Sequence, residues 1–238
     1  VSISIEEKGV LSIIGPNGAG KTTFFNLLTG FLHPTTGKIF LKGEDITGIP
    51  PFEIVHKKVS RSFQIASYFP EFTILENIQM GILNRLGYSY SYFAKISQLK
   101  DVFKGAEKYV DMLGLAEQKN IKAKFLSHGD KKILDITMGL TTEPEILLLD
   151  EPTSGVSGAE RAKVINFIKD LAKKIKIIVV EHDMDIVFSI SDRIVVLAQG
   201  SILADGMVED IRNNEDVQKV YLGGYSEGGC EDVITGKH

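Results

Sequence analysis

The sequence predicts an α/β fold in which helices cover both faces of a mainly parallel sheet. Short apolar runs typical of buried strands alternate with helix-length segments near both ends of the chain. Between these parts, residues 73–142 have helical spacing and few strand signals. We therefore expect an α/β core with a small antiparallel β subdomain and an inserted helical subdomain.

The composition is that of an ordinary globular protein. The 238 residues are 43% hydrophobic and 24% charged, which suits one large domain or a core with an inserted subdomain. A net charge of −4 gives no overall argument for a nucleic-acid partner, and we expect none. The single cysteine, Cys230, excludes an intrachain disulfide and suits a reducing compartment. Because no apolar run approaches a membrane-spanning length and no signal-peptide pattern opens the chain, any work at a membrane requires a partner.

The first elements expected are a strand over residues 10–14 and a helix over residues 24–28, which Gly30 stops. Residues 1–5 alternate apolar side chains with serines, which is the pattern of a half-buried strand. Since the chain opens on Val1 rather than Met, we expect it to begin inside a domain, with a further strand upstream.

The β subdomain is expected as a hairpin over residues 37–47, with residues 39–41 as its first arm and residues 42–45 as its turn. Proline and glycine punctuate the chain after it. The later elements expected are a helix over residues 52–59, a strand over residues 61–64, strands over residues 146–149, 176–180, 193–197 and 201–204, and a helix over residues 158–174.

Between the first strand and the first helix lies a glycine-rich loop with the spacing G-x-x-x-x-G-K-[ST]. Such glycines let successive N–H groups converge on phosphate oxygens, and the helix N-terminus adds a partial positive charge. Lys21 would neutralise the β- and γ-phosphates of ATP, and the Thr22 hydroxyl would ligate Mg²⁺. The alternative is a glycine-rich turn with a lysine nearby. The residues expected to bind nucleotide here are Gly15, Pro16, Asn17, Gly18, Ala19, Gly20, Lys21, Thr22 and Thr23.

An acidic pair, Asp150 and Glu151, ends the apolar run of residues 146–149. Asp150 would hold Mg²⁺ through water, and Glu151 would accept a proton from the attacking water. Strands in many proteins also end in a solvated acidic pair, and that interpretation stays open. On the first interpretation, the pair supplies two of the groups that ATP hydrolysis needs beyond a phosphate loop, a second anchor for Mg²⁺ and a group that polarises water.

Two further polar residues follow expected strands. Gln64 could contact Mg²⁺ or the attacking water and report the nucleotide state to the helical insertion, although a lone glutamine is usually polar surface. His182 follows the strand of residues 176–180, and the sites of parallel sheets lie beyond the C-terminal ends of their strands. A structural histidine is the alternative interpretation.

Residues 126–130 lead into a helix of the insertion. Ser127 is an N-cap candidate, and Asp130 would complete a capping box. The N-terminus of this helix could also meet a phosphate.

In this order, the motifs resemble the nucleotide-binding subunit of ATP-binding-cassette (ABC) transporters, over nearly the whole chain. The correspondences are residues 15–22 for the phosphate loop, Gln64 for the glutamine loop, residues 126–130 (LSHGD) for the LSGGQ signature, Asp150 and Glu151 for the magnesium-strand motif, residues 154–157 for the D-loop and His182 for the switch histidine. The resemblance implies a P-loop NTPase core and one ABC ATPase domain over residues 1–222. Its core would comprise residues 1–66 and 143–222, its helical subdomain residues 67–142, and a flexible tail residues 223–238.

The resemblance also implies a mechanism in which two cassettes face head to tail and trap two ATP molecules between them. Ser127 and the Gly129 N–H would contact the γ-phosphate held by the other subunit. Glu151 would act as the base, and His182 would hold the γ-phosphate and the water in line.

The sequence departs from the family pattern at three places. The signature has His128 and Asp130 where glycine and glutamine are usual, and the D-loop has Ser157 in place of its aspartate. The aromatic residue that stacks on adenine in the family would precede the first strand, outside this chain.

Several segments resemble the importers of branched-chain amino acids, namely residues 62–64, 72–78, 126–130, 181–189 and 217–223. Urea and amide importers, and the cassette that drives lipopolysaccharide export, share several of these features. The function implied is ATP hydrolysis that powers the uptake of branched-chain amino acids or similar small solutes through a separate membrane permease.

The partners implied are a second cassette, identical or different, the permease chains and an extracytoplasmic solute-binding protein, with this subunit on the cytoplasmic face of the membrane. The permease would dock between Gln64 and about residue 114, where aromatic residues gather: Tyr68, Phe69, Phe72, Tyr88, Tyr90, Tyr92 and Phe93. These aromatics are equally compatible with ordinary core and surface positions.

Two other classes of protein compete with a transporter. Cassette proteins of DNA repair carry a long coiled coil, and those of translation carry two cassettes, and this chain has neither. A regulatory module that binds nucleotide without hydrolysis is the other class, and the presence of Lys21, Asp150, Glu151 and His182 argues against it.

Overall fold

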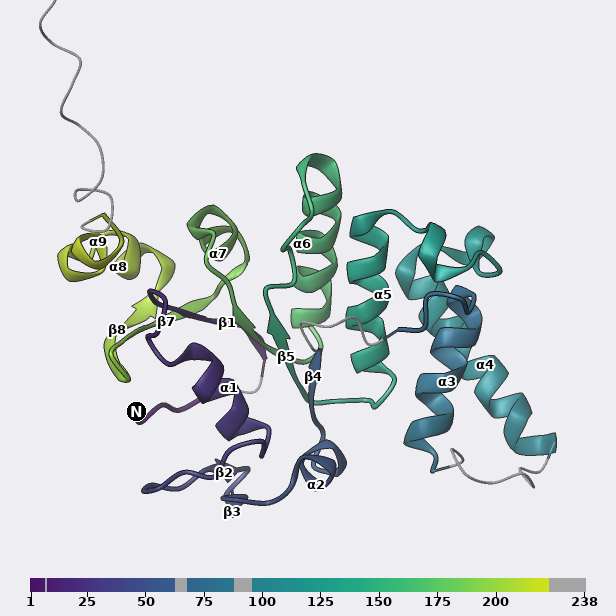
Figure 1. Ribbon diagram of the computed structural model, residues 1–238, viewed down its shortest axis with the longest axis horizontal. Coiled ribbons are helices and arrows are strands. Elements are labelled where there is room, and N and C mark those ends of the chain that lie inside the picture. Colours follow the sequence, from purple (N-terminus) through teal and green to yellow (C-terminus); the bar gives the residue numbers. More distant parts are fainter. Residues whose placement is uncertain (7, 63–67, 88–95, 223–238) are drawn as a thin grey trace, which may run out of the picture.

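A six-stranded sheet forms the centre of the molecule in the computed structural model, which describes residues 1–6, 8–62, 68–87 and 96–222 (Figure 1). The strands lie in the order β4-β5-β6-β1-β7-β8, and their bounds are β1 Gly9–Ile14, β4 Val59–Ser62, β5 Ile146–Asp150, β6 Lys176–Val180, β7 Arg193–Ala198 and β8 Ser201–Met207. Neighbouring strands pair in parallel from β4 to β7, while β8 runs antiparallel to β7. The mainly parallel sheet expected from the strand–helix alternation is confirmed.

Helices lie on both faces of this sheet (Figure 1). Their bounds are α1 Lys21–Leu28, α2 Pro51–His56, α3 Ile74–Arg85, α4 Ile96–Leu113, α5 His128–Leu140, α6 Gly158–Ala172, α7 Met184–Ile190, α8 Val208–Arg212 and α9 Glu215–Leu222. Alternate residues of β5 point to opposite faces, so that Leu147 and Leu148 belong to different buried clusters. Phe25 of α1 joins the cluster of Leu148, whereas Leu134 of α5 and Val164 of α6 join that of Leu147.

The turn between α1 and the following segment depends on Gly30, whose φ angle of 72° lies in the left-handed region. A Cβ at this position would come within 2.3 Å of the Ile49 carbonyl oxygen, so no larger residue fits. The helix therefore ends where the sequence predicts.

The hairpin forms, but with a shorter turn than expected. Strands β2 (Phe40–Leu41) and β3 (Glu44–Asp45) pair antiparallel, so Glu44 and Asp45 belong to the second strand rather than to the turn. Only Lys42 and Gly43 make the turn, and both have positive φ angles, 51° and 81°. A two-residue turn with this backbone matches the right-handed twist of the strands.

Helix α2 ends at His56, three residues before the expected end at residue 59. Lys58 adopts a left-handed φ of 67°, which stops the helix, and Val59 already pairs with Ile146 in the sheet. β4 thus begins earlier than the expected strand over residues 61–64, of which residues 63 and 64 lie outside the described part of the chain.

The strand expected over residues 1–5 is not formed. Residues 1–6 belong to the described part of the chain and have no regular secondary structure. The alternation does appear in burial: Ile3 and Ile5 are half-buried against the cluster that contains Phe25. The alternation of apolar residues therefore predicted correctly which side chains are half-buried. It did not predict the backbone conformation, because a strand also requires hydrogen bonds to a neighbouring strand.

The helical insertion consists of α3, α4 and α5 with two short 3₁₀ turns, Ala116–Gln118 and Ala123–Phe125. The first helix, α3, begins with a capping box in which the Glu76 N–H donates to Thr73 Oγ1 at 3.1 Å and the Thr73 N–H donates to Glu76 Oε2 at 2.7 Å. Ile78 and Ile82 of its buried face join the same cluster as Leu147 of the sheet, so the insertion and the core share apolar packing.

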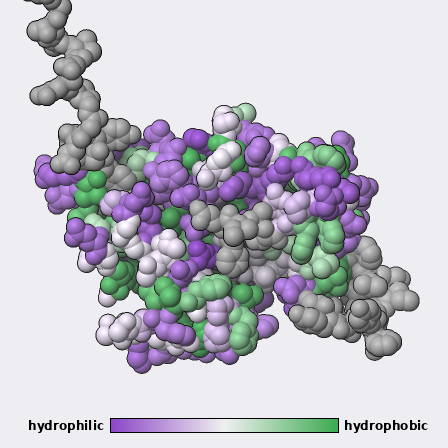
Figure 2. Space-filling model, viewed as in Figure 1, coloured by the Kyte–Doolittle hydropathy of each residue, from purple (hydrophilic) through white to green (hydrophobic). Residues whose placement is uncertain are grey.

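Apolar side chains gather on the lower part of the face seen in Figure 2, at the level of the hairpin and α2. Phe40 of the hairpin and Phe52 of α2 are exposed large apolar residues.

Candidate functional site

The loop with the phosphate-binding spacing connects the C-terminal end of β1 to α1. A side chain at Gly15 would place its Cβ 2.2 Å from the Leu197 carbonyl oxygen, so the loop passes too close to β7 for any other residue. Gly18 and Gly20 have φ angles of 79° and 102°, which favour glycine. The loop therefore reaches the N-terminus of α1 in a backbone path that the glycines make possible, at the end of a helix that favours anions.

The remaining residues of the loop divide into exposed and buried positions. Ala19 is the buried member, and its side chain belongs to the apolar cluster that contains Phe25. The exposed members, which a bound phosphate could reach, are Pro16, Asn17, Gly18, Thr22 and Thr23.

The ammonium group of Lys21 forms hydrogen bonds to two backbone carbonyls of its own loop. Its Nζ donates to the Gly15 carbonyl at 2.6 Å and to the Pro16 carbonyl at 3.0 Å. Burial lowers the pKa of Lys21 below its usual value, and the negative charges of Glu151 and Asp150 oppose that shift. The two carboxylates therefore lie within electrostatic reach of the loop lysine, as the proposed chemistry requires.

Asp150 ends β5 and forms a nearly buried ion pair with Arg61 of β4. Arg61 Nη2 lies 2.8 Å from Asp150 Oδ2, and about a tenth of each side chain is exposed. Arg61 Nη1 donates to Asn26 Oδ1 of α1 at 2.7 Å, and the guanidinium lies 5.4 Å from the centre of the Phe25 ring. One arginine thus ties the carboxylate of β5 to the helix that follows the phosphate loop.

Sequence reasoning missed Arg61. The available signal was a charged residue within a short strand whose C-terminal end was expected to reach the site. A guanidinium in such a position needs a carboxylate nearby, because an unpaired buried charge is costly.

Glu151 and His182 lie together at the C-terminal edge of the sheet. The Glu151 N–H donates to the Val180 carbonyl at 2.9 Å, which continues the β5–β6 pairing into the loop. His182 Nδ1 lies 3.5 Å from Glu151 Oε1, and the imidazole is 66% exposed. The structure thus brings both residues expected to be catalytic to the same edge.

Ser127 and Gly129 are placed by the start of α5. Ser127 is the N-cap, with its Oγ accepting from the Asp130 N–H at 3.2 Å, so the N-cap expectation is confirmed. The expected capping box is not formed, because the Asp130 carboxylate accepts from the Ser127 hydroxyl at 3.1 Å rather than from its backbone N–H. Asp130 is also paired with Lys163 of α6. A Cβ on Gly129 would lie 2.9 Å from Glu160 Cβ, so this glycine lets α5 approach α6 closely.

Within one chain, Ser127 and Gly129 are separated from the phosphate loop by the sheet. α5 and α1 pack into different buried clusters, on the faces marked by Leu147 and Leu148 respectively. The helices α5 and α1 therefore cover opposite faces of the sheet.

Gln64 lies outside the described residues, as do four of the aromatics expected at the permease surface, Tyr88, Tyr90, Tyr92 and Phe93.

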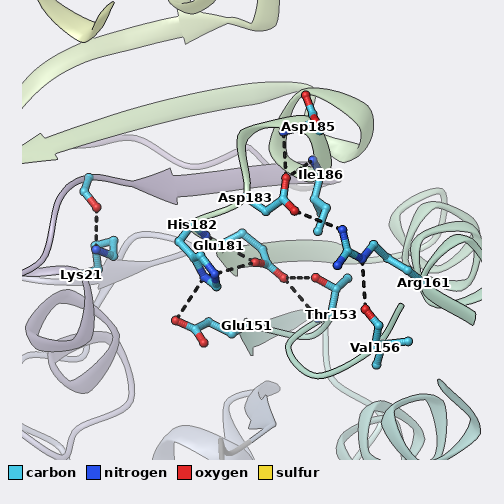
Figure 3. Close-up of polar contacts among 11 residues, drawn as sticks. Lys21, Glu151, Thr153, Val156, Arg161, Glu181, His182, Asp183, Asp185 and Ile186 are labelled. Carbon is cyan, nitrogen blue, oxygen red and sulfur yellow. Dashed lines mark hydrogen bonds and ion pairs between the residues drawn. The ribbon is translucent and has the colours of Figure 1, made fainter. Parts of the chain in front are cut away.

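Two polar residues that the sequence did not single out, Thr153 and Glu181, meet beside this edge (Figure 3). The buried Glu181 carboxylate accepts from the Thr153 N–H at 3.1 Å and from Thr153 Oγ1 at 2.6 Å. The signal in the sequence was a glutamate directly after the apolar strand of residues 176–180, next to His182.

The donor set at the loop fits magnesium. Thr22 offers a hydroxyl and Asp150 a carboxylate, which are the hard oxygen donors that Mg²⁺ takes in addition to substrate phosphates and water. Within the described ranges, no group of three or more His, Cys, Asp or Glu side chains is arranged to hold a metal ion.

Among the helices that the structure describes, none is both long enough and apolar enough to cross a membrane.

Comparison with known proteins gives one consistent result. The family model described as ABC transporter matches residues 1–154. The branched-chain amino acid transport ATP-binding protein LivG of Salmonella typhimurium is 40% identical over 233 residues, covering 94% of this chain and 90% of LivG. The corresponding BraF of Pseudomonas aeruginosa is 41% identical over 232 residues, with the same shares covered.

A solved structure agrees with the sequence relatives. The ADP conformation of MJ1267, an ATP-binding cassette of an ABC transporter, matches with a TM-score of 0.82 and 33% identity, over 94% of this chain and 91% of that one. The fold, the family model and the relatives together show that the chain belongs to the ABC transporter family, as one of its ATP-hydrolysing ATP-binding subunits.

Proposed function

We propose that this ATPase powers the uptake of branched-chain amino acids through a separate membrane permease. The observation that carries the choice of solute is the 40% and 41% identity, over 94% of the chain, to LivG and BraF, both named for branched-chain amino acid transport. The core chemistry rests on the meeting of Lys21, Asp150, Glu151 and His182 at one edge of the sheet.

The loop residues would hold the phosphates of ATP. Lys21, which now donates to two loop carbonyls, would turn its ammonium to the β- and γ-phosphates. Thr22 and Asp150 would hold Mg²⁺, with Gln64 as a further contact. Bound magnesium neutralises charge on the phosphates.

Glu151 would accept a proton from water while the water oxygen bonds to the γ-phosphorus and the bond from that phosphorus to the β-phosphate oxygen breaks. His182, 3.5 Å from Glu151, would hold the γ-phosphate and the water in line. ADP and inorganic phosphate leave, and the proton passes from Glu151 to solvent.

A second cassette would complete the site. Because the sheet separates Ser127 and Gly129 from the phosphate loop of their own chain, these residues would meet the γ-phosphate on a partner cassette, identical or different. The exposed position of Ser127 at the N-terminus of α5 supports this arrangement, since a helix N-terminus favours an anion.

The permease would dock on the helical side of the domain. We propose a core of residues 1–66 and 143–222 and a helical subdomain of residues 67–142. Phe69 and Phe72 are 48% and 39% exposed beside α3, with ring centres 5.2 Å apart, and support an apolar contact there. The working location would be the cytoplasmic face of the membrane, with a solute-binding protein on the other side.

The test is to isolate the tagged chain from its native membrane in mild detergent and to reconstitute the purified complex in vesicles. We expect permease chains and a second cassette to accompany it, and ATP to drive the uptake of labelled leucine, isoleucine and valine. Uptake of urea without uptake of these amino acids, or a complex without any membrane protein, would overturn the proposal.

A further inference from the structure

We propose that Glu181 is a positioning residue that holds Glu151 and His182 in their working geometry, acting on the first through Thr153 and on the second directly. The inference deepens the proposed function, since it rests on Glu151 and His182 being the groups that act on ATP. Its basis is a buried carboxylate that the ATPase chemistry described above does not use.

Glu181 is almost fully enclosed, with 1% of the residue exposed, at the C-terminal end of β6. Burying a carboxylate is costly unless hydrogen-bond donors surround it. Three donors do: the Thr153 N–H at 3.1 Å and Thr153 Oγ1 at 2.6 Å point to Oε1, and the His182 N–H points to Oε2 at 3.3 Å. All three belong to the two loops that carry Glu151 and His182.

The loop that begins at Glu151 needs such support. Glu151 has a φ angle of 47°, a left-handed conformation that is unfavourable for a non-glycine residue and that persists only where the surroundings hold it. The Ser154 N–H donates to the Glu151 carbonyl at 3.1 Å and the Val156 N–H to the Thr153 carbonyl at 3.1 Å, so the segment is a tight double turn. Glu181 fixes the centre of that turn through both donors of Thr153.

The far end of the same turn is anchored separately. Arg161 of α6 donates from Nε to the Val156 carbonyl at 3.1 Å and from Nη1 to Asp183 Oδ2 at 3.1 Å. Asp183 in turn caps α7 by accepting from the Asp185 and Ile186 N–H groups. The turn is therefore held at its end by α6 and α7. Next to Glu151 it is held by Glu181 through Thr153 and by the Val180 carbonyl, which accepts from the Glu151 N–H.

His182 lies between two carboxylates, as Figure 3 shows. Its Nδ1 is 3.9 Å from Glu181 Oε2 and 3.5 Å from Glu151 Oε1. Three hydrogen bonds hold the buried Glu181 carboxylate on one side of the imidazole, while the Glu151 side chain on the other side is 30% exposed. This arrangement orients the ring toward the edge where the phosphate would lie.

The proposal predicts a loss of turnover without a loss of ATP binding, because the phosphate loop is a separate structure. Displacing a catalytic group by about 1 Å can cost on the order of 100-fold in rate, so we expect kcat to fall about 10- to 100-fold. The KM for ATP should change by no more than about threefold, because positioning of the base acts on the transition state.

Two substitutions probe the two sides of Glu181 in the purified transporter complex. In Glu181→Gln, one of the two carboxylate oxygens is replaced by an NH₂ group, which cannot accept a hydrogen bond. If the remaining oxygen accepts from Thr153, the NH₂ group faces the His182 N–H, and the contact with His182 is lost. Thr153→Val removes the hydroxyl at nearly constant volume, and Thr153→Ser restores it as the matched control. We expect Thr153→Ser to keep kcat within about twofold of the unsubstituted complex, with Thr153→Val and Glu181→Gln both slow.

The readouts separate positioning from stability and from the proposed function. Binding of a fluorescent ATP analogue and the melting temperature are measured beside kcat and KM. A folded Glu181→Gln complex with unchanged kcat, or equal losses for Thr153→Val and Thr153→Ser, would overturn the inference while leaving the ATPase intact. Failure of the unsubstituted complex to hydrolyse ATP would instead overturn the proposed function.

Discussion

Glu151 occupies an unusual backbone position for its proposed task. It directly follows β5, its N–H continues the pairing to the Val180 carbonyl, and its φ angle of 47° turns the chain sharply out of the sheet. The turn presents a carboxylate that is 30% exposed, beside His182 and within electrostatic reach of Lys21. A general base needs this combination of access to water and proximity to the phosphate.

Glu151→Gln should abolish most turnover while leaving ATP binding in place. The amide cannot accept the proton of the attacking water, and loss of a general base typically lowers the rate by on the order of 10²–10⁴. Phosphate release from ATP and the affinity for a fluorescent ATP analogue are the measurements. Near-normal release of phosphate by the folded variant would contradict the assignment.

Arg61 shows that a residue can support the site through charge rather than through contact with substrate. Its ion pair with Asp150 is about nine-tenths buried on both sides. Arg61→Met should destabilise the protein by about 3–5 kcal/mol, because removing one partner leaves an uncompensated buried charge. The midpoint of urea unfolding checks this value.

The matched control for Arg61 is Lys173→Ala. Lys173 pairs with Asp170 on the surface, where both side chains are more than 70% exposed, so its removal should leave the midpoint nearly unchanged. Equal effects of the two substitutions would show that the buried pair contributes no more than a surface pair.

At the scale of elements, the start of α5 is shaped by its contact with α6. Alanine normally favours a helix over glycine, but a Cβ at Gly129 would lie 2.9 Å from Glu160 Cβ and 3.3 Å from the Glu160 carbonyl oxygen. Gly129→Ala should therefore destabilise the protein by about 1–3 kcal/mol, as overpacking does. Urea unfolding measures the change.

Gly105 of α4 gives the control for this substitution. A Cβ there would be 3.4 Å from Ile82 Cδ1, an ordinary contact. Gly105→Ala should stabilise the protein by up to about 1 kcal/mol through helix propensity. If both alanine substitutions stabilise the protein, the close approach of α5 and α6 at Gly129 does not exclude a side chain there.

The capping box of α3 should make stability depend on pH. Hydrogen bonds from the Thr73 N–H and hydroxyl lower the pKa of Glu76 below its usual value. A carboxyl group with a lowered pKa in the folded state stabilises the fold above its unfolded-state pKa, and that contribution is lost as the pH falls through the folded-state pKa.

Glu76→Gln tests this dependence, because the amide cannot ionise. The difference in urea midpoint between the two proteins should be present at neutral pH and should shrink on acidification to about pH 3, below the usual glutamate range. A difference that does not vary with pH would show that the charge of Glu76 has no part in the cap.

At the scale of the whole molecule, the sheet divides the residues expected to touch ATP into two groups. At the C-terminal ends of the strands lie the phosphate loop, Asp150, Glu151 and His182. Ser127 and Gly129 instead stand at the start of α5, a helix on the opposite face of the sheet from α1. The proposed function therefore assigns two separate half-sites to each chain, as a head-to-tail pair requires.

ATP should therefore drive pairing of cassettes when hydrolysis is blocked. The Glu151→Gln chain, with its second cassette where that is a different protein, should sediment as a dimer in ATP and as a monomer in ADP. Adding Ser127→Arg should prevent the dimer, because a bulky side chain would fill the contact with the γ-phosphate. A monomer at saturating ATP would contradict the head-to-tail arrangement.

Local sequence determined most of the elements and the position of the phosphate loop. Apolar runs predicted β1, β5, β6 and β7 closely, because a strand buried on both faces has to be apolar throughout. The sequence erred where backbone conformation decides the boundary: Lys58 ends α2 early with a left-handed φ, and Lys42 shares a two-residue turn with Gly43. These conformations have weak sequence signals in residues other than glycine.

Spacing along the chain predicted the residue types of the site, because a strand, a glycine loop and a helix have to occur in that order to bind phosphate. Only the tertiary structure paired Arg61 with Asp150 and Thr153 with Glu181, since these partners are distant in sequence and meet only when β4, β5 and β6 lie side by side. A buried charge has to find its partner across the sheet, and the sequence alone cannot show which strand lies next to it.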